Sequence, residues 1–281
     1  MIAPVVAPQA VAELDTGNLV LADVRWYLDG RDGKAAFEQS HVAGAVWVDL
    51  EHALAAHGLP ATEGRHPFPT PEAFAAAMGR LGIGDDTVVV AYDDTGGLTA
   101  GRLVVMLRML GRNAAVLNGG LTAWANAGFA VESGPARQPE PATFTAAPWP
   151  ADRLATADDT LAVAANGGVV IDARPLARFT GEQALIDPRP GHVPGARSAP
   201  WSAVLNDDGQ LLSADELKAH YAALGVTQPD TPSVAYCGSG VSACMNILAM
   251  EHVGLTSPRL YVASWSGWSA DSDRDAELGG L

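Results

Sequence analysis

Short runs of hydrophobic residues alternate with longer amphipathic stretches along most of this chain. Three apolar runs in the first half predict buried strands: residues 19–22, 87–92 and 114–117. The stretches 71–81 and 101–110 have helical spacing, and the first begins with a proline, which suits the first turn of a helix. A further helix is predicted around Trp124. Alternating strands and helices indicate a parallel sheet of the α/β class.

The second half of the chain repeats this order of elements. An apolar run that ends in Asp-x-Arg occurs at residues 19–25 and again at 169–174, and His-Val-x-Gly-Ala follows in both halves. Helices at 214–224 and 243–253 flank a strand at 233–236. The chain is therefore predicted to hold two copies of one α/β domain, each a parallel sheet flanked by helices. Their expected bounds are residues 1–134 and 152–281, with a Pro- and Ala-rich linker at 135–151.

The motifs present in both copies are predicted to be architectural, because only one copy is expected to be catalytic. Two internal ion pairs are expected near the strand ends: Asp23 with Arg25, and Asp172 with Arg174. The motif histidines, His41 and His192, are expected to satisfy loop carbonyls rather than to transfer protons.

The loop between the strand at 233–236 and the following helix has the strongest chemical signal. It begins at Cys237 and reads CGSGVS, with Gly238 and Gly240 allowing a sharp turn. Backbone N–H groups gathered at the start of a helix stabilise an anion. A cysteine at the mouth of such a nest is expected to exist largely as the thiolate, so Cys237 is the candidate nucleophile.

The corresponding loop of the first copy lacks this nucleophile. Asp93 stands where the second copy has Cys237, so the first copy is predicted to be a non-catalytic scaffold. Arg65 and His66 lie in a first-half loop that could reach a site, and the sequence leaves their role open.

Composition narrows the range of partners and compartments. The net charge of −15 argues against a nucleic-acid or anionic-membrane surface. The only cysteines, Cys237 and Cys244, lie too close along one loop and helix for a ready disulfide, and they lack metal-ligand spacing. No signal peptide is expected at the N-terminus, so a reducing cytoplasm is predicted.

The duplicated motifs, the cysteine loop and the final Trp-Ser-Gly-Trp at 265–268 together resemble two-domain rhodanese-type sulfurtransferases, over nearly the whole chain. The resemblance implies tandem rhodanese-like domains. Thiosulfate enzymes of this family typically carry basic residues just after the cysteine, where this chain has Gly238 and Ser239. The loop is more similar to that of 3-mercaptopyruvate sulfurtransferases, with Ser242 where threonine is usual.

The resemblance also implies a set of site residues. Arg178 and Arg189 are expected to bind a carboxylate or α-keto acid, since a planar guanidinium binds a carboxylate with two hydrogen bonds. The loop is expected to contribute backbone contacts to the substrate: Gly238, Gly240 and Val241. Ser239 and Ser242 are expected to hydrogen-bond the thiol or relay a proton.

The expected reaction moves sulfur from 3-mercaptopyruvate, through a persulfide on Cys237, to a thiol or to cyanide. The thiol belongs to a small molecule or to a thioredoxin-like protein, and no metal or organic cofactor is implied. Three alternatives stay open: a thiosulfate enzyme, a cysteine phosphatase and a non-catalytic sulfur-carrying module. The phosphatase is disfavoured because Ala243 stands where a phosphate-clamping arginine is needed.

Overall fold

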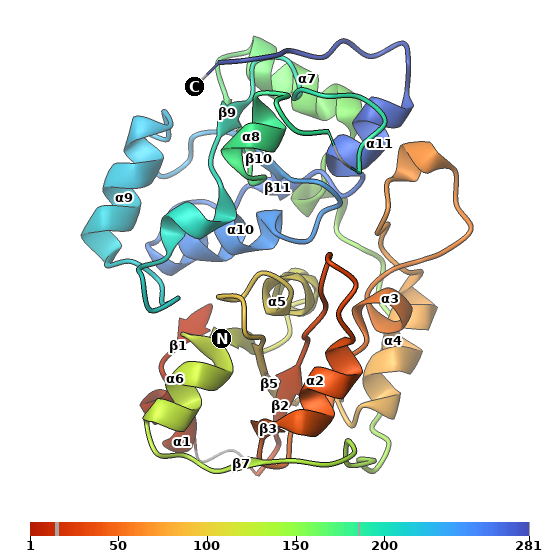
Figure 1. The fold of residues 1–281 in the computed structure, drawn as a ribbon, viewed down its shortest axis with the longest axis vertical. Helices are drawn as coiled ribbons and strands as arrows, with labels where there is room; N and C mark the ends of the chain where they lie inside the picture. The colour runs from red at the N-terminus through yellow and green to blue at the C-terminus, as the bar shows by residue number, and fades with distance from the viewer. Residues whose placement is uncertain (15–16, 185, 281) are drawn as a thin grey trace. The chain divides into compact units, whose positions relative to one another are not determined.

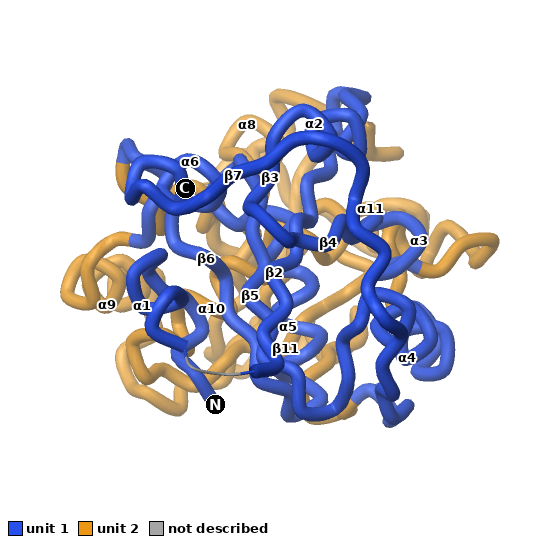
Figure 2. Tube along the Cα trace, turned by 90° about the horizontal axis from the view of Figure 1, so that it is seen from below, with its two compact units in different colours: residues 1–55, 69–149, 207–211 blue, residues 56–68, 150–206, 212–281 orange. Residues whose placement is uncertain are grey.

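The computed structural model describes residues 1–14, 17–184 and 186–280, and its elements are coloured along the chain in Figure 1. The chain divides into two compact units, which Figure 2 colours separately. Unit 1 consists of Met1–Ala55, Pro69–Trp149 and Asp207–Leu211, and unit 2 of Ala56–Phe68, Pro150–Asn206 and Leu212–Leu281. None of the helices in the described part of the chain is long and apolar enough to cross a membrane.

The units differ from the predicted domain bounds in three segments. Residues 135–149, predicted as linker, belong to unit 1. Each unit also contains a short segment from the other half of the chain: residues 56–68 lie in unit 2, and residues 207–211 lie in unit 1. Sequence periodicity gave no sign of this exchange, because neither segment has a regular pattern.

Unit 1 is built on a parallel sheet with strand order β1-β6-β5-β2-β4, and the short pair β3 and β7 is antiparallel. Its strands are β1 (Val5–Val6), β2 (Leu19–Asp23), β3 (His41–Val42), β4 (Val46–Trp47), β5 (Val88–Tyr92), β6 (Ala114–Leu117) and β7 (Val131–Glu132). Its helices are α1 (Pro8–Ala12), α2 (Gly33–Gln39), α3 (Leu50–Ala53), α4 (Pro71–Arg80), α5 (Ala100–Met109) and α6 (Gly120–Asn126). The central β5 is buried along its whole length, as its unbroken apolar run predicts.

Unit 2 has a four-stranded parallel sheet with order β11-β10-β8-β9. Its strands are β8 (Val169–Asp172), β9 (Arg197–Ser198), β10 (Ser233–Tyr236) and β11 (Arg259–Leu260). Its α-helices are α7 (Ala157–Ala165), α8 (Leu176–Phe179), α9 (Ala214–Ala223), α10 (Ala243–His252) and α11 (Ser264–Ala270), and its 3-10 turns are η1 (Ala61–Glu63), η2 (Ala151–Arg153) and η3 (Trp201–Val204). The parallel α/β fold predicted for both halves is confirmed.

The duplicated motifs have the architectural roles predicted for them. Each Asp-x-Arg pair is buried and doubly hydrogen-bonded, with closest nitrogen–oxygen distances of 2.7 Å in unit 1 and 2.6 Å in unit 2. His41 Nδ1 lies 2.8 Å from the carbonyl of Phe37, and His192 Nδ1 lies 2.9 Å from that of Phe179. These contacts fasten the loops beside the carboxyl ends of the strands in both units.

Residues 135–149 of the predicted linker are packed against the rest of unit 1. Phe144 is buried and meets the ring of Phe74 edge-on, with 5.7 Å between ring centroids. The indole of Trp149 donates to the carbonyl of Pro69 at 2.8 Å, and Ala142 N–H donates to the carbonyl of Gly79 at 2.9 Å. The segment has no helix or strand between 133 and 150, yet its aromatic side chains anchor it.

Candidate active site around Cys237

Cys237 is the first residue after β10, at the carboxyl end of the sheet of unit 2. Its side chain is buried, with 2% exposure for the residue, and the loop 237–242 leads directly into α10. Parallel α/β sheets bind ligands at the carboxyl ends of their strands, because the loops there are free to vary. The structure therefore places the predicted nucleophile at the end of the sheet where a site is expected.

The amino end of α11 holds the start of this loop. Trp265 N–H donates to the carbonyl of Cys237 at 2.9 Å, and Ser266 N–H donates to that of Gly238 at 3.0 Å. Cys237 N–H donates in turn to the hydroxyl of Ser264 at 3.1 Å. Ser264 has a φ of 54°, which is unusual for a residue other than glycine and marks a strained position. The strained residue is thus the one whose hydroxyl accepts the hydrogen bond from the backbone of Cys237.

The amides of the loop form an open nest. Those of Gly238, Ser239, Val241 and Ser242 donate to no other group of the described chain. Buried N–H groups are almost always paired, so a row of them without protein acceptors indicates that an anion or water normally accepts from them. The nest also adjoins the amino end of α10, where the helix dipole favours negative charge.

A segment from the first half of the chain contributes to this site through a close backbone approach. A Cβ on Gly64 would lie 2.4 Å from the carbonyl oxygen of Ala263, and a Cβ on Gly267 would lie 2.5 Å from that of Thr62. Glycine is therefore needed on both sides of this contact between η1 and α11. Arg65 and His66 directly follow Gly64, so this contact places them in unit 2.

His66 faces the second residue after the nucleophile. Its Nδ1 lies 2.7 Å from the hydroxyl oxygen of Ser239, and both side chains are buried. An imidazole in contact with a hydroxyl can pass a proton in either direction near neutral pH. The contact is compatible with the proton relay predicted for Ser239, and it places His66 next to the loop that begins at Cys237.

Two arginines meet over Gly238. A Cβ built on Gly238 would lie 2.9 Å from Nη2 of Arg65 and 3.1 Å from Nη2 of Arg178. Both arginines also hydrogen-bond Asp187, Arg65 to Oδ1 at 2.6 Å and Arg178 to Oδ2. A side chain at position 238 would therefore displace the two guanidinium groups from their present places.

Asp187 is ionised at the centre of this cluster. Burial alone would raise the pKa of its carboxyl, but the hydrogen bonds and charges of Arg65 and Arg178 hold that pKa below its ordinary value. Arg174 adds a weaker contact, with 3.9 Å between its Nη1 and Oδ2 of Asp187. The Nε atoms of Arg65 and Arg178 are buried and have no hydrogen-bond partner among the described residues.

The guanidinium of Arg189 binds backbone carbonyls, and its predicted role in binding the donor stays a prediction. Its Nε donates to the carbonyl of Ser269 at 3.1 Å, its Nη1 to Arg274 at 2.9 Å and its Nη2 to Asp271 at 2.9 Å. Carbonyls at the end of a helix lack partners within the helix, and a guanidinium satisfies several at once. Arg189 thus closes the end of α11, and Arg65, which the sequence left open, occupies the place beside Arg178.

Ser242 precedes α10 and its side chain makes no capping hydrogen bond, so its role in binding the thiol stays a prediction. Val241 is buried and Gly240 has a φ of 71°, which a glycine adopts without strain. Cys244 lies inside α10, where its thiol donates to the carbonyl of Gly240 at 3.4 Å. Cys244 is therefore part of the scaffold beneath the loop.

In unit 1 a side chain of the loop itself, that of Asp93, occupies the loop after β5. The carboxylate of Asp93 accepts five hydrogen bonds from its own loop and the start of α5: the amides of Thr95, Gly97, Thr99 and Ala100 and the hydroxyl of Thr99, at 2.8 to 3.0 Å. Asp93 is 1% exposed. The anion nest of this copy thus holds a permanent carboxylate.

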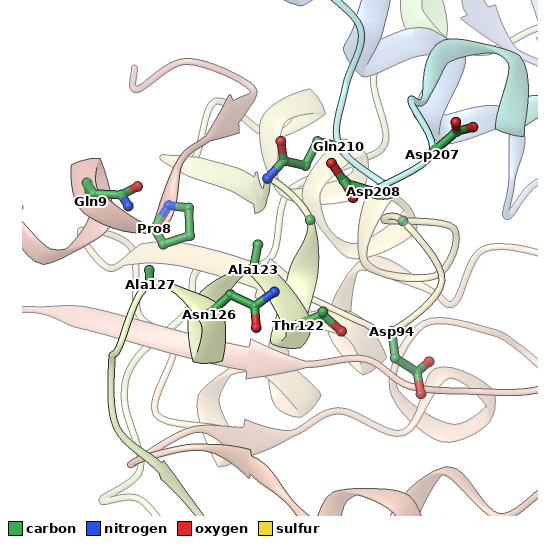
Figure 3. A pocket seen from close by; sticks show the side chains of 13 residues that line it. Pro8, Gln9, Asp94, Thr122, Ala123, Asn126, Ala127, Asp207, Asp208 and Gln210 are labelled. Atoms are coloured by element: carbon green, nitrogen blue, oxygen red, sulfur yellow. The ribbon is translucent and has the colours of Figure 1, made fainter.

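A cavity of about 590 Å³ borders the same loop in unit 1, through Asp94 and Gly96 (Figure 3). Residues 207–211 close another of its sides, with Asp207, Asp208 and Gln210 among the lining residues. The described residues that line it include three carboxylates and no lysine or arginine. Its charge disfavours the anionic ligands that suit the Cys237 loop.

One signal in the sequence could have directed attention to Arg65 and His66. The connection between the His-Val-x-Gly-Ala motif and the next helix is longer in the first half than in the second. An excess segment in one copy of a duplicated fold is a candidate for a function that the other copy lacks. That residues 56–68 lie in unit 2 depends on long-range contacts, which local sequence patterns do not encode.

Comparison with known proteins agrees with the duplicated fold. The family model of the rhodanese-like domain matches residues 6–127 and 156–271. A probable 3-mercaptopyruvate sulfurtransferase of Pseudomonas aeruginosa is 37% identical over 276 residues, which cover 97% of each chain. A putative thiosulfate sulfurtransferase, SseB of Mycobacterium tuberculosis, is 38% identical over 280 residues, which cover 98% of this chain and 96% of the relative.

The solved structure of SseA from Escherichia coli, a 3-mercaptopyruvate sulfotransferase, superposes with a TM-score of 0.81 at 32% sequence identity. The match covers 94% of this chain and 99% of that one. The relatives named for two different sulfur donors are about equally similar to this chain, so overall similarity does not decide which donor it takes.

Proposed function

The chain belongs to the rhodanese-like family and is a sulfurtransferase, and on that premise we propose that it takes sulfur from 3-mercaptopyruvate through Cys237. The observation that carries the proposal is the open nest of loop amides that begins at the residue after this cysteine, with Arg178 lying against Gly238. The nest suits an anionic sulfur, and the arginine suits the carboxylate of an α-keto acid.

In the proposed reaction, the thiolate of Cys237 attacks the sulfur of 3-mercaptopyruvate. The carbon–sulfur bond breaks, and its electron pair leaves on carbon as the enolate of pyruvate. Ser239 and His66 carry the proton of the donor thiol to the enolate carbon, since their side chains are 2.7 Å apart and adjoin the loop. The enzyme is left with a persulfide, whose terminal sulfur accepts hydrogen bonds from the loop amides.

An acceptor thiol then attacks the terminal sulfur of the persulfide, and Cys237 leaves as the thiolate. Cyanide reacts in the same way and becomes thiocyanate. The proposal includes either a small thiol or a thioredoxin-like protein as the acceptor, and a location in the cytoplasm, where the two free cysteines would stay reduced.

The test follows the sulfur directly. Protein incubated with 3-mercaptopyruvate and no acceptor is expected to gain the mass of one sulfur atom on the peptide that holds Cys237, and to release one equivalent of pyruvate. Cys237→Ser is expected to do neither, whereas Cys244→Ala is expected to do both. Transfer that survives in Cys237→Ser would overturn the proposal.

A further inference from the structure

We infer that Arg65 is a donor-binding residue that supplies the second cation needed for a doubly charged sulfur donor such as thiosulfate. The inference rests on the proposed function and concerns which donors the same cysteine accepts. The loop itself has no cationic side chain, since Cys237 is followed by Gly-Ser-Gly-Val-Ser. Taken alone, the loop predicts a poor thiosulfate site. The arginine that changes this charge comes from residues 56–68, far away in the sequence.

The position of Arg65 is fixed at both ends of the residue. Its N–H donates to the hydroxyl of Ser266 at 3.1 Å, and its Nη1 donates to Asp187 at 2.6 Å. Its Nη2 reaches to within 2.9 Å of where a Cβ on Gly238 would lie. The guanidinium therefore lies against the residue that follows the nucleophile, and it is held there before any donor binds. A group held in place loses little conformational entropy when it binds a ligand.

The cluster keeps a net positive charge after its internal pairing. Arg65 and Arg178 bring two positive charges, and Asp187 brings one negative charge. Each arginine donates from one Nη atom to a different oxygen of Asp187. The Nε atoms of both arginines are buried and have no partner among the described residues. Asp187 acts as a positioning residue that holds two like charges side by side, and one positive charge of the cluster is left for a ligand.

The chemistry of thiosulfate makes the second cation important. The thiolate of Cys237 attacks the outer sulfur, the sulfur–sulfur bond breaks, and sulfite leaves with the electron pair as a dianion. No proton has to move, so stabilisation of two negative charges is the main demand on the protein. 3-Mercaptopyruvate has one carboxylate, for which Arg178 already lies in place. Loss of Arg65 is thus expected to affect thiosulfate more than 3-mercaptopyruvate.

The test measures kcat/KM for both donors, with cyanide as acceptor at fixed ionic strength, in the full-length wild type, Arg65→Ala and Arg65→Lys. Loss of one charge-assisted hydrogen bond predicts a fall of about 10- to 100-fold for thiosulfate in Arg65→Ala. The fall for 3-mercaptopyruvate is expected to stay within about threefold on the same scale. Arg65→Lys keeps the charge and is expected to recover part of the thiosulfate activity.

The ratio of the two kcat/KM values is the deciding quantity, because a smaller fraction of folded enzyme lowers both equally. Arg80→Ala is the matched control, since it removes an exposed arginine at the end of α4 in unit 1, and its ratio should equal that of wild type. An unchanged ratio in Arg65→Ala would overturn the inference, as would a wild type that does not use thiosulfate. Absence of persulfide with 3-mercaptopyruvate would instead refute the proposed function.

Discussion

The loops after β5 and β10 are two copies of one structure that differ in what fills them. In unit 1 the carboxylate of Asp93 accepts the loop hydrogen bonds. In unit 2 the equivalent position is Cys237, and the amides of Gly238, Ser239, Val241 and Ser242 have no acceptor among the described residues. A carboxylate in the nest stabilises the loop and leaves nothing for a ligand. The open nest of the other copy is available for an anionic sulfur.

The second difference lies in the segments that each loop receives from the other half of the chain. Residues 56–68 bring Arg65 and His66 to the loop of unit 2, and residues 207–211 bring Asp207 and Asp208 to the cavity beside the loop of unit 1. Both segments follow a short helical element that comes after β4 or β9. The same exchange therefore supplies an arginine and a histidine in one unit, and carboxylates in the other.

The largest effect is expected from Asp93→Ala, which removes the carboxylate from the loop of unit 1 and should lower the free energy of unfolding. The substitution leaves four amides and the hydroxyl of Thr99 without their acceptor, and each unsatisfied buried donor costs about 1 kcal/mol or more. Urea unfolding is expected to show that the free energy of unfolding falls by about 5 kcal/mol on that basis. Added formate should restore part of this stability, because a small carboxylate fits the emptied nest.

Asp94→Ala is the control for this experiment. Asp94 accepts one hydrogen bond from the hydroxyl of Tyr27, at 2.6 Å, and its loss is expected to cost about 1 kcal/mol with no rescue by formate. A loss for Asp93→Ala no larger than that for Asp94→Ala would show that the loop of unit 1 does not depend on its internal carboxylate.

The sequence predicted the elements under both loops better than the contacts around them. The strands at 114–117 and 233–236 have the predicted bounds, because short apolar runs between turns fix a buried strand locally. The Asp-x-Arg pairs were also predictable, since their partners are two residues apart. Both successes depend on local information.

The donor side of the site was less predictable. Arg189 was expected at the donor site from the resemblance to the family, and that role stays a prediction; its guanidinium binds carbonyls around the end of α11. Arg65 reaches Asp187 across 122 positions of sequence. A contact of this kind depends on the approach of Gly64 to α11, which no periodicity reveals.

A smaller effect, on kcat, is expected from His66→Ala. It tests whether 3-mercaptopyruvate, unlike thiosulfate, needs a proton transfer. His66 contacts Ser239 and is proposed to pass a proton to the enolate of pyruvate. Its loss is expected to lower kcat with 3-mercaptopyruvate about 100-fold, the lower end of general acid–base effects. Thiosulfate turnover should change little, since sulfite leaves without a proton.

Ser239→Ala removes the other member of the pair. If both act in one relay, His66→Ala combined with Ser239→Ala should be no slower than either single variant. A fall of equal size with both donors would contradict a proton-transfer role and would indicate that His66 only supports the loop. Steady-state rates of pyruvate and thiocyanate formation distinguish these outcomes.

The smallest remaining activity is expected when the nucleophile is moved between the copies, in the double variant Asp93→Cys with Cys237→Ser. The introduced thiol would lie in an intact nest, but the neighbouring cavity is lined by Asp94, Asp207 and Asp208 and by no arginine among the described residues. Carboxylates repel anionic donors. Turnover with either donor is expected to stay below about 1% of wild type, two decades on the usual free-energy scale. Alkylation by iodoacetamide would establish that the thiol is accessible. Substantial pyruvate or thiocyanate formation by the double variant would show that a thiol in the nest suffices, and that the surrounding charges do not separate the two copies.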